Sequence, residues 1–339
     1  MMRIEYNYCG KTSSFYILKI TAKKGIMNMA YEKRKVILTV AQTGNFQGKA
    51  DNPGLPEQPE EIIQSAYDCY NAGASLVHVH ARNKAGKSCN DPAIFAEINS
   101  GIRAKCPIII QNSTAPATRD DAHTDDGLGV LGITDPGALP EMFTLDCSLM
   151  TTTWGELEFI YMWTRKWLID VAKKMKEMGV RIEIEVFDPT AIEDVFKHLY
   201  PAGVLTEPIS MTLVMGMDKV SQGAIGCTQK NIDYMIDLAK DCAAAAGVKM
   251  PLNITTMAIG AQQLHGTVYG MLRGNHIRTG MEDNINYSYR RPAKSNAELV
   301  ERVVRLVRDL DMEIATPEEA REMIGLAQLK DNGKVRGNI

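Results

Sequence analysis

The stretch Ser75-Leu76-Val77-His78-Val79-His80-Ala81-Arg82 is typical of a short buried β-strand, and it carries two histidines one residue apart. Because side chains alternate between the two faces of a strand, His78 and His80 point the same way and can bind one metal ion together. Neutral imidazoles suit zinc, whose catalytic sites take three protein ligands and leave a fourth position open. The alternative is a pair of polar core residues satisfied by neighbours, although burying both unpaired would cost free energy. The pattern favours a metal site whose third ligand has to be found elsewhere.

Working outward from this strand, eight short apolar segments alternate with helical patterns, which indicates strand–helix units and a parallel sheet. We expect the strands at residues 36–41, 76–81, 108–113, 143–147, 181–187, 209–215, 253–259 and 276–281. Eight such units in a chain of 339 residues, with no internal linker rich in Pro, Gly or Ser, favour a single (β/α)8 TIM barrel in the α/β class. An open doubly wound sheet is the alternative fold, but no G-x-G-x-x-G motif follows the first strand to support it.

Helix start and stop signals agree with this arrangement. A helix over 59–72 begins at Pro59 and is stopped by Gly73. The last long helix starts at Ser295 with Glu298 three residues later, which predicts a capping box, and a short helix follows from Thr316. We therefore expect one catalytic domain over 35–330, a poorly ordered extension over 1–34 and a tail over 331–339.

Composition excludes several classes of protein. The net charge of −3 gives no electrostatic footprint for nucleic acid, and no apolar run approaches the roughly 18 residues of a membrane span. The seven cysteines are scattered without a CxxC pair, which fits a reduced cytoplasmic compartment. We also expect a homo-oligomer.

The end of the eighth predicted strand is dense in charge, reading Arg278-Thr279-Gly280-Met281-Glu282-Asp283-Asn284. Arg278 and Glu282 are four residues apart, so in a strand their side chains lie on the same face. In a barrel, strands two and eight both flank strand one. Glu282 can therefore join His78 and His80 as the third metal ligand. The alternative is an ion pair between Arg278 and Glu282 that closes the barrel.

Two other strand ends carry candidate site residues. Strand five holds Glu183 and Glu185 on one face, and a buried carboxylate there is costly unless it pairs, binds a cation or transfers protons. We favour Glu185, which lies nearer the carboxyl end. Strand three ends in Gln111-Asn112-Ser113-Thr114, polar groups suited to binding a carboxylate or carbonyl oxygen, although such residues also form turns. The polar segment 116–140 that follows predicts a long loop at the site face.

Several ordered motifs make the chain resemble the β-keto acid cleavage enzymes, from about Val36 to Ile324. The motifs are His78-Val79-His80-Ala81-Arg82, Gln111-Asn112-Ser113-Thr114, Thr144-Leu145-Asp146-Cys147, Glu183-Ile184-Glu185-Val186-Phe187-Asp188, Arg278-Thr279-Gly280-Met281-Glu282-Asp283-Asn284 and Lys294-Ser295-Asn296-Ala297-Glu298-Leu299-Val300. Six motifs in order, at spacing like that of the family, are specific together although none is decisive alone.

The resemblance implies a zinc-bearing TIM barrel that combines a β-keto acid with acetyl-CoA and yields acetoacetate and a new CoA ester by retro-Claisen chemistry. Matched motif by motif, the family's Zn²⁺ ligands fall on His78, His80 and Glu282, and its catalytic pair on Asp283 and Arg278. Its remaining substrate-pocket and catalytic positions fall on Ser113, Thr144 and Glu185, with Asn112 beside Ser113 as a further expected contact. Asp283 would then act as the base, tuned by Arg278. Strict alternation points Asp283 away from the face of Glu282, so we expect the strand to end before it and the chain to turn inward.

The sequence departs from the 3-keto-5-aminohexanoate cleavage enzyme at one place. After strand one, the chain has Phe46 where that enzyme carries the glutamate that recognises the substrate's ammonium group. We therefore expect a substrate whose side group is uncharged, or is a quaternary ammonium that meets the ring face of Phe46.

Two other functions remain as alternatives. Zinc hydrolases of the amidohydrolase type also use His-x-His on a barrel, but they place it on the first strand with further histidines on strands five and six, where this chain has none. The lyase that cleaves hydroxymethylglutaryl-CoA also carries a His-x-His pair, but places it late in the barrel and not on strand two. The order along the chain therefore argues against both enzymes. A non-catalytic binding barrel is the second alternative.

Overall fold

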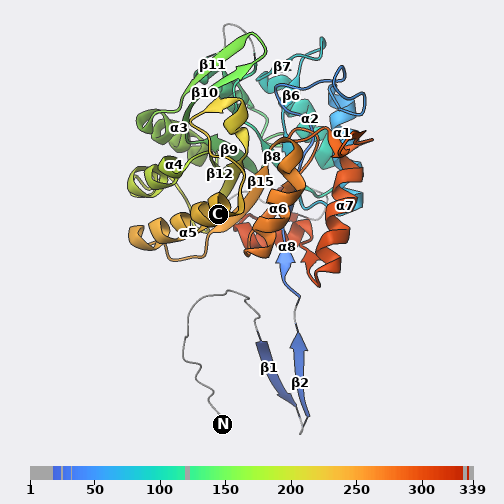
Figure 1. Ribbon diagram of the computed structural model, residues 1–339, viewed down its shortest axis with the longest axis vertical. Coiled ribbons are helices and arrows are strands. Elements are labelled where there is room, and N and C mark those ends of the chain that lie inside the picture. Colours follow the sequence, from blue (N-terminus) through green and yellow to red (C-terminus); the bar gives the residue numbers. More distant parts are fainter. Residues whose placement is uncertain (1–17, 24–25, 32, 119–122, 331–333, 336–339) are drawn as a thin grey trace.

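Eight parallel strands close into a barrel at the centre of the molecule (Figure 1). The computed structural model describes residues 18–23, 26–31, 33–118, 123–330 and 334–335. The barrel order is β12-β13-β15-β16-β4-β5-β8-β9, so β5 and β16 flank β4 as predicted. The strands are β4 (Leu38–Ala41), β5 (Leu76–Val79), β8 (Ile109–Asn112), β9 (Met142–Asp146), β12 (Arg181–Val186), β13 (Ser210–Met215), β15 (Asn253–Ala258) and β16 (His276–Thr279). All eight predicted strands are present, and the TIM barrel is confirmed.

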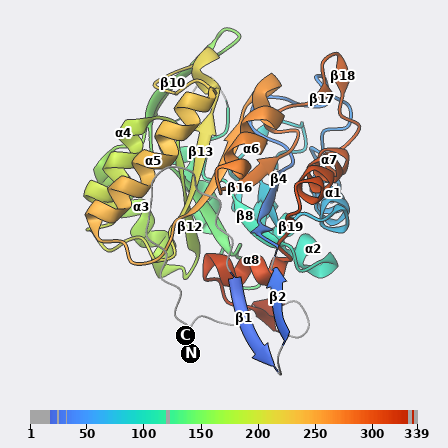
Figure 2. The ribbon, with the colours of Figure 1, turned by 60° about the horizontal axis from the view of Figure 1, so that its bottom comes forward.

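Helices alternate with these strands and surround the barrel (Figures 1 and 2). They are α1 (Pro59–Ala72), α2 (Pro92–Lys105), α3 (Arg165–Glu177), α4 (Pro189–Asp194), α5 (Gln229–Ala246), α6 (Gln263–Leu272), α7 (Asn296–Asp309) and α8 (Pro317–Ile324). Shorter helical turns are η1 (Thr124–Gly132), η2 (Val195–Leu199), η3 (Met217–Lys219) and η4 (Gly260–Gln262). No helix in the described part of the chain is long and apolar enough to cross a membrane.

Small two- and three-stranded sheets lie outside the barrel. The antiparallel hairpin of β10 (Leu149–Trp154) and β11 (Leu157–Met162) pairs with β14 (Ser221–Gln222) and rises above β9 in Figure 1. The other pairs are β3 (Lys35–Val36) with β19 (Glu313–Ile314), β6 (Ala81–Arg82) with β7 (Ser88–Cys89), β17 (Asn286–Ser288) with β18 (Arg291–Pro292), and β20 (Leu329–Lys330) with β21 (Lys334–Val335).

The expected N-terminal extension contains the antiparallel pair β1 (Leu18–Lys23) and β2 (Ile26–Tyr31), which lies outside the barrel on the side of α8 (Figures 1 and 2). Residues 1–17 of that extension, and most of the expected tail over 331–339, lie outside the described residues. The poor order of both ends stays a prediction.

The helix ends follow the predicted signals with one difference. Helix α1 begins at Pro59, and Gly73 ends it in a left-handed conformation, with φ of 111°. The Ser295 side chain caps α7 by accepting a hydrogen bond from the Glu298 backbone N–H. The predicted capping box is wrong in its second half, because the Glu298 carboxylate accepts from the backbone N–H of Lys294 and pairs with Arg291.

The main core lies between the strands and the surrounding helices, and a second cluster lies under α8 at the amino-terminal end of the barrel. Helix α8 is attached there by Arg321, whose guanidinium donates two hydrogen bonds to Glu141, at 2.6 and 3.0 Å. Both side chains are almost completely buried. Because α8 covers this end, the carboxyl ends of the strands are left to form the site.

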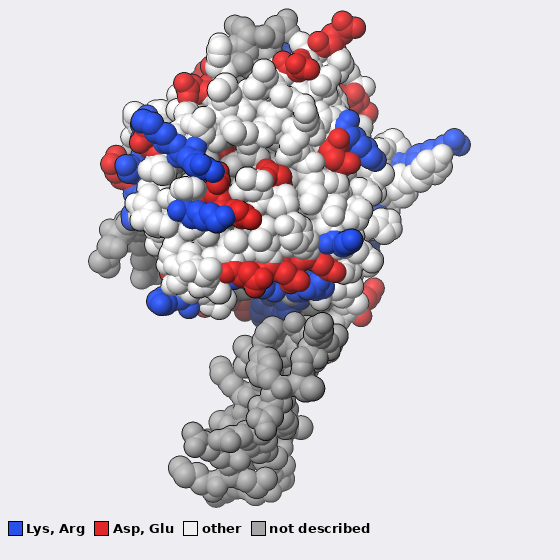
Figure 3. Space-filling model, turned by 60° about the vertical axis from the view of Figure 1, so that its left-hand side comes forward, with Lys and Arg blue, Asp and Glu red and all other residues white. Residues whose placement is uncertain are grey.

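The outer face that carries α3, α4 and α5 mixes both signs of charge (Figure 3). Arg165 forms an ion pair with Asp194 there, and Lys197 with Glu193. These pairs are solvent-exposed, so they contribute little to stability.

Candidate metal site and active site

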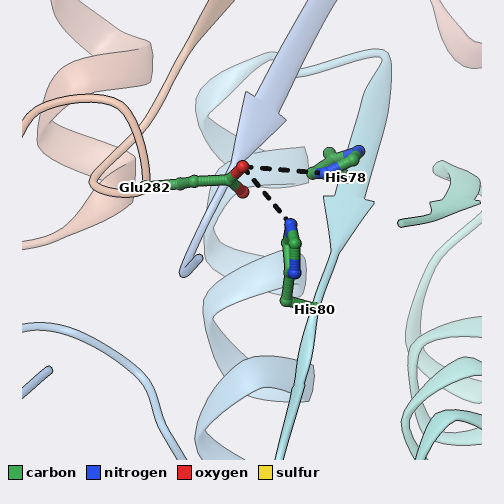
Figure 4. Close-up of side chains that lie close together, drawn as sticks. All are labelled: His78, His80 and Glu282. Atoms are coloured by element: carbon green, nitrogen blue, oxygen red, sulfur yellow. Dashed lines mark ion pairs between the residues drawn. The ribbon is translucent and has the colours of Figure 1, made fainter. Parts of the chain in front are cut away.

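His78 on β5 and His80, the residue just after β5, point toward Glu282, which follows β16 (Figure 4). The Nε2 atoms of His78 and His80 lie 3.8 and 3.4 Å from Oε1 of Glu282. One ligand atom from each residue lies within 4.8 Å of the others, an arrangement that could hold a metal ion. Three ligand atoms at about 2 Å from a tetrahedral ion lie roughly 3.3 Å apart, so the spacing suits one ion with three protein ligands.

Amide side chains fix both imidazole rings. Nδ1 of His78 lies 2.9 Å from Oε1 of Gln111, and Nδ1 of His80 lies 3.1 Å from Oδ1 of Asn45. An amide oxygen accepts, so each Nδ1 carries the proton and each Nε2 presents a lone pair toward Glu282. Burial lowers the pKa of His78 to about 3, which keeps this ring neutral and ready to act as a ligand.

Glu282 has the chemistry of a third ligand. Burial alone would raise its pKa, but Arg278 and the two histidines hold the pKa below its ordinary value, so the group is ionised. Its Oε2 atom is buried and has no hydrogen-bond partner in the described part of the chain. Gly44 leaves room for this side chain, because a Cβ atom at residue 44 would lie 2.6 Å from Cγ of Glu282.

Arg278 connects the carboxylates of the site. Its Nη2 donates to Oε1 of Glu282 at 2.7 Å, and its Nη1 donates to Oε1 of Glu185 at 3.1 Å. Its Nε and Nη2 also donate to the two oxygens of Asp283. The alternative ion pair between Arg278 and Glu282 therefore exists together with the histidine contacts.

A sharp turn after β16 brings Asp283 behind Arg278. The strand ends at Thr279, and Gly280 has φ of 140°, with its Cα against β4. A Cβ on residue 280 would lie 1.9 Å from the carbonyl oxygen of Ala41. The expected inward turn is therefore present, and it depends on a glycine at this position. Burial raises the pKa of Asp283 to about 6, although Arg278 opposes the shift.

Glu185 forms a carboxyl pair with Asp146, its register partner on the neighbouring strand β9. Burial raises the pKa of Asp146 to about 6, and burial together with the charge of Asp146 raises that of Glu185 well above its usual range. Two carboxyl groups can hydrogen-bond only if one is protonated, so the pair holds one proton near neutral pH.

These groups line a cavity of about 140 Å³ at the carboxyl ends of the strands. The predicted residues that line it are Phe46, His78, His80, Ser113, Glu185, Arg278 and Glu282. A groove of about 920 Å³ beside it shares Trp163 and contains none of the predicted site residues.

Three predicted residues lie next to the cavity without lining it. The Asp283 side chain is buried behind Arg278, and Thr144 lies deeper on β9, with Oγ1 accepting from the backbone N–H of Thr114. In an extended strand the side chain of Asn112 lies on the face opposite to those of Gln111 and Ser113. Neither polar atom of the Asn112 side chain has a hydrogen-bond partner among the described residues. The functional roles of these three residues stay predictions.

Sequence reasoning gave no specific role to two groups of residues at the site. The first comprises Asp146 and Asn45, which line the cavity, and Gln111, which orients His78 from outside it as Asn45 orients His80. Asp146 shares strand parity with Thr144, a signal that could have identified it. The second group is an apolar wall formed by Met150, Trp154 and Tyr161 of the β10–β11 hairpin and by Trp163, which follows it.

A TIM barrel with a buried His-His-Glu group and an arginine–carboxylate network at its carboxyl end defines a barrel enzyme with a candidate metal site. Residues 35–326 match the beta-keto acid cleavage enzyme family. The chain is 34% identical over 301 residues to a 3-keto-5-aminohexanoate cleavage enzyme of Acetoanaerobium sticklandii, covering 87% of this chain and 99% of that protein. It is 29% identical to a 3-dehydrocarnitine:acetyl-CoA trimethylamine transferase of Rhizobium meliloti, covering 87% of this chain and 98% of that protein. The chain belongs to the β-keto acid cleavage enzyme family.

A solved structure supports the fold alone. The ternary complex of ObcA with a C4-CoA adduct and oxalate superimposes with a TM-score of 0.65 at 19% identity, covering 82% of this chain and 68% of that one. The members of the matched family cleave a carbon–carbon bond of a β-keto acid, so this chain is an enzyme of that reaction class.

Proposed function

We propose that this protein is a zinc-dependent β-keto acid cleavage enzyme that uses acetyl-CoA as the acetyl donor. The products are acetoacetate and the CoA ester of the remaining acyl group. The observation that carries the proposal is the convergence of His78, His80 and Glu282 beside Arg278 in one cavity, within a chain of this family. Relatives named as acetyl-CoA transferases support acetyl-CoA as the second substrate; one is the 3-oxoadipate:acetyl-CoA acetyltransferase of Cupriavidus necator, at 29% identity.

His78, His80 and Glu282 would hold the zinc ion. Two neutral imidazoles and one carboxylate are a donor set that zinc accepts in catalytic sites. When bound, the ion supplies positive charge that attracts the oxygens of a β-keto acid. The oriented Nε2 atoms and the unpartnered Oε2 of Glu282 support this assignment.

We assign proton transfer to the pair of Arg278 and Asp283. Arg278 lines the cavity and holds Asp283 directly beside it, so we propose that Asp283 takes the proton from the carbon between the two carbonyl groups. Arg278 keeps its own protons and positions the Asp283 carboxylate. Asp283 suits the role of acceptor, because its pKa of about 6 is close to physiological pH. Glu185 shares Arg278 and contributes a carboxyl group that can donate a hydrogen bond.

The bond changes then balance without a further reactant. Loss of the proton gives an enolate whose carbon attacks the acetyl thioester, so a C–C bond forms and the CoA thiolate leaves. The thiolate attacks the original keto carbon, the adjacent C–C bond breaks, and the acetoacetate enolate takes the proton back. Ser113 lines the cavity, and Asn112 and Thr144 lie beside it; we propose that all three help to hold the substrate.

The side group of the substrate would meet Phe46, whose ring lies 5.1 Å from that of Trp154. A phenyl ring offers no counter-charge to a primary ammonium. We therefore propose that the substrate's side group is uncharged or a quaternary ammonium. We also propose that the protein works in the cytoplasm as a homo-oligomer.

The test is a screen of β-keto acids against the zinc-loaded protein, with and without acetyl-CoA. Mass spectrometry identifies the CoA esters that form. We expect one zinc per chain and equal amounts of acetoacetate and a new CoA ester, formed only when acetyl-CoA is present. Consumption of substrate by hydrolysis without CoA would support a zinc hydrolase instead. Zinc binding without turnover of any keto acid would support a binding protein. Clear preference for 3-keto-5-aminohexanoate over neutral keto acids would contradict the role given to Phe46.

A further inference from the structure

Arg82 belongs to the same sequence motif as the two histidines, and the proposed reaction gives it no role. It lies on β6 and is 4% exposed. Its Nε donates to the hydroxyl of Thr43 at 3.0 Å, and its Nη2 donates to the carbonyl oxygens of Gly44, at 2.5 Å, and Gln47. Its Nη1 donates to the carbonyl oxygen of Gly86 at 2.8 Å. Three of these four hydrogen bonds hold the loop that follows β4.

Asn45 lies between the two carbonyl groups of this loop that Arg82 holds. Its Nδ2 donates to the carbonyl oxygen of Pro116 at 2.9 Å, and its Oδ1 lies 3.1 Å from Nδ1 of His80. A backbone carbonyl only accepts, so the Asn45 amide cannot be turned round without losing its bond to Pro116. The path of the loop therefore decides which nitrogen of His80 carries the proton.

The chemistry of arginine suits this task. A guanidinium is planar and presents its donors in a fixed fork, so acceptors on one loop are held in a defined arrangement. A lysine ammonium carries the same charge, but it is a compact group on a flexible stem and cannot reproduce the fork. The carboxylate of Glu57 lies 4.0 Å from Nη1 of Arg82, at the outer limit of an ion pair. The guanidinium therefore serves mainly to bind the oxygens of the loop.

We propose that Arg82 is a positioning residue of the metal site. It fixes the loop after β4, and the loop places Asn45 so that His80 keeps its proton on Nδ1 and presents Nε2 to the metal. The inference rests on the proposed function for the metal itself, whereas the position of the proton on His80 is a property of the metal-free protein. His78 does not depend on Arg82, because its Nδ1 lies against Gln111 on β8.

The first test observes the histidine rings of the metal-free protein. Arg82→Lys keeps the charge and removes the fork of donors. Two-bond ¹H–¹⁵N NMR correlations of protein labelled with ¹⁵N-histidine, recorded at mildly alkaline pH, show which ring nitrogen carries the proton. We expect His80 to carry it on Nδ1 in the wild-type protein and to become a mixture of both tautomers in Arg82→Lys. His78 should keep its proton on Nδ1 in both proteins, as the internal control.

The second test measures zinc affinity by competition with a chelator. We expect Arg82→Lys to lose at least about tenfold, because losing the partner of a metal-bound imidazole costs about 10- to 100-fold. Asn45→Ala should lose a similar factor. The double variant should be little weaker than Asn45→Ala alone, because Arg82 acts through Asn45 and the two losses are then not additive.

Arg103→Lys is the matched control. The Arg103 guanidinium also binds two carbonyl oxygens of one loop, those of Gly137 and Leu139, but this loop precedes β9 at the opposite end of the barrel. We expect this variant to leave zinc affinity and the His80 ring unchanged. If Arg82→Lys does not fold, Thr43→Val takes its place, since it removes one acceptor of Arg82 and should change both measurements in the same direction by less.

Three results would overturn the inference: an unchanged His80 ring in the folded Arg82 or Thr43 variant, equal losses of zinc affinity in Arg103→Lys, or additive losses in the double variant. A wild-type protein that binds no zinc would contradict the proposed function instead. In that case the tautomers of His80 in the metal-free proteins would still decide the role of Arg82.

Discussion

The guanidinium of Arg278 holds Asp283 by two hydrogen bonds, from Nε to Oδ2 at 3.1 Å and from Nη2 to Oδ1 at 2.8 Å. The same guanidinium reaches Glu185 and Glu282, so one buried cation orders three carboxyl groups from two different strand ends. Removing one member changes the charge balance of all the others.

Asp283→Asn should remove the proton acceptor while keeping the size of the side chain. We expect kcat to fall by about 10²- to 10⁴-fold, the usual contribution of a general base, with metal content unchanged. Steady-state kinetics with acetyl-CoA and metal analysis of the same preparation measure both quantities. Asp170→Asn, which alters an exposed ion pair on α3, is the control. A kcat within threefold of the wild-type value would exclude Asp283 as the base.

His78→Ala should abolish metal binding and activity together, because two remaining ligands cannot hold the ion tightly. Gln111→Leu is the finer variant, since it removes only the partner of His78 Nδ1 and should weaken metal affinity by about 10- to 100-fold. Elemental analysis and titration against a zinc chelator report these changes. His198→Ala, at a half-exposed position on η2, should change neither. Full metal content in His78→Ala would refute the ligand assignment.

Gly280→Ala should destabilise the protein and displace Asp283. The added Cβ would collide with the Ala41 carbonyl oxygen, and φ of 140° is unfavourable for any side chain. Gly274→Ala is the matched control, because φ there is 101° but nothing lies within 4 Å of the added atom. We expect the free energy of unfolding in urea to fall by about 2 kcal/mol more for Gly280→Ala than for the control. Equal losses would show that the close approach to β4 is not what requires glycine.

The stability of the metal-free protein should fall as the pH is lowered from about 6.5 toward 3. Burial, with a smaller contribution from Arg34, lowers the pKa of His276 from 6.5 to about 3, and its Nδ1 accepts from the backbone N–H of Ile37. Below pH 6.5 the unfolded chain binds a proton at this histidine and the folded chain does not, so acid favours unfolding. His78 adds the same dependence.

His276→Gln keeps a hydrogen-bond acceptor that does not titrate. Urea unfolding between pH 4.5 and 6 in the presence of a chelator should show a slope smaller by about 1.4 kcal/mol per pH unit, the value for one proton. An unchanged slope would mean that His276 is protonated in the folded protein.

The sequence predicted the strands well because parallel barrel strands are apolar on both faces and stand out from the amphipathic helices. Their carboxyl ends were less well predicted. The eighth strand was expected to reach Met281 but ends at Thr279, because Gly280 takes a conformation that leaves the strand. A glycine in the sequence does not by itself show which sign its φ angle takes.

The metal ligands were predictable because two lie one residue apart at the end of one strand, and the third follows a strand with a known place in the barrel. The strand parity of Asp146 with Thr144 could have placed it in the cavity. Its pairing with Glu185 and the contact of Asn45 with His80 were not predictable, since they depend on the register between strands and on the path of the loop after β4. The apolar wall depends on a hairpin over 149–162, in a stretch where the strand–helix alternation predicted no strands. Arg321 and Glu141 meet although 180 residues separate them, a pairing that no local pattern indicates.

The apolar wall also gives the protein an optical reporter. The chain has three tryptophans, and two of them, Trp154 and Trp163, line the cavity, whereas Trp167 donates a hydrogen bond to Asp125 on η1. Two of the three tryptophan rings therefore lie where a molecule bound in the cavity would change their surroundings and their fluorescence. Occupancy of the site can be followed in the unlabelled protein in real time, before any bond is made or broken.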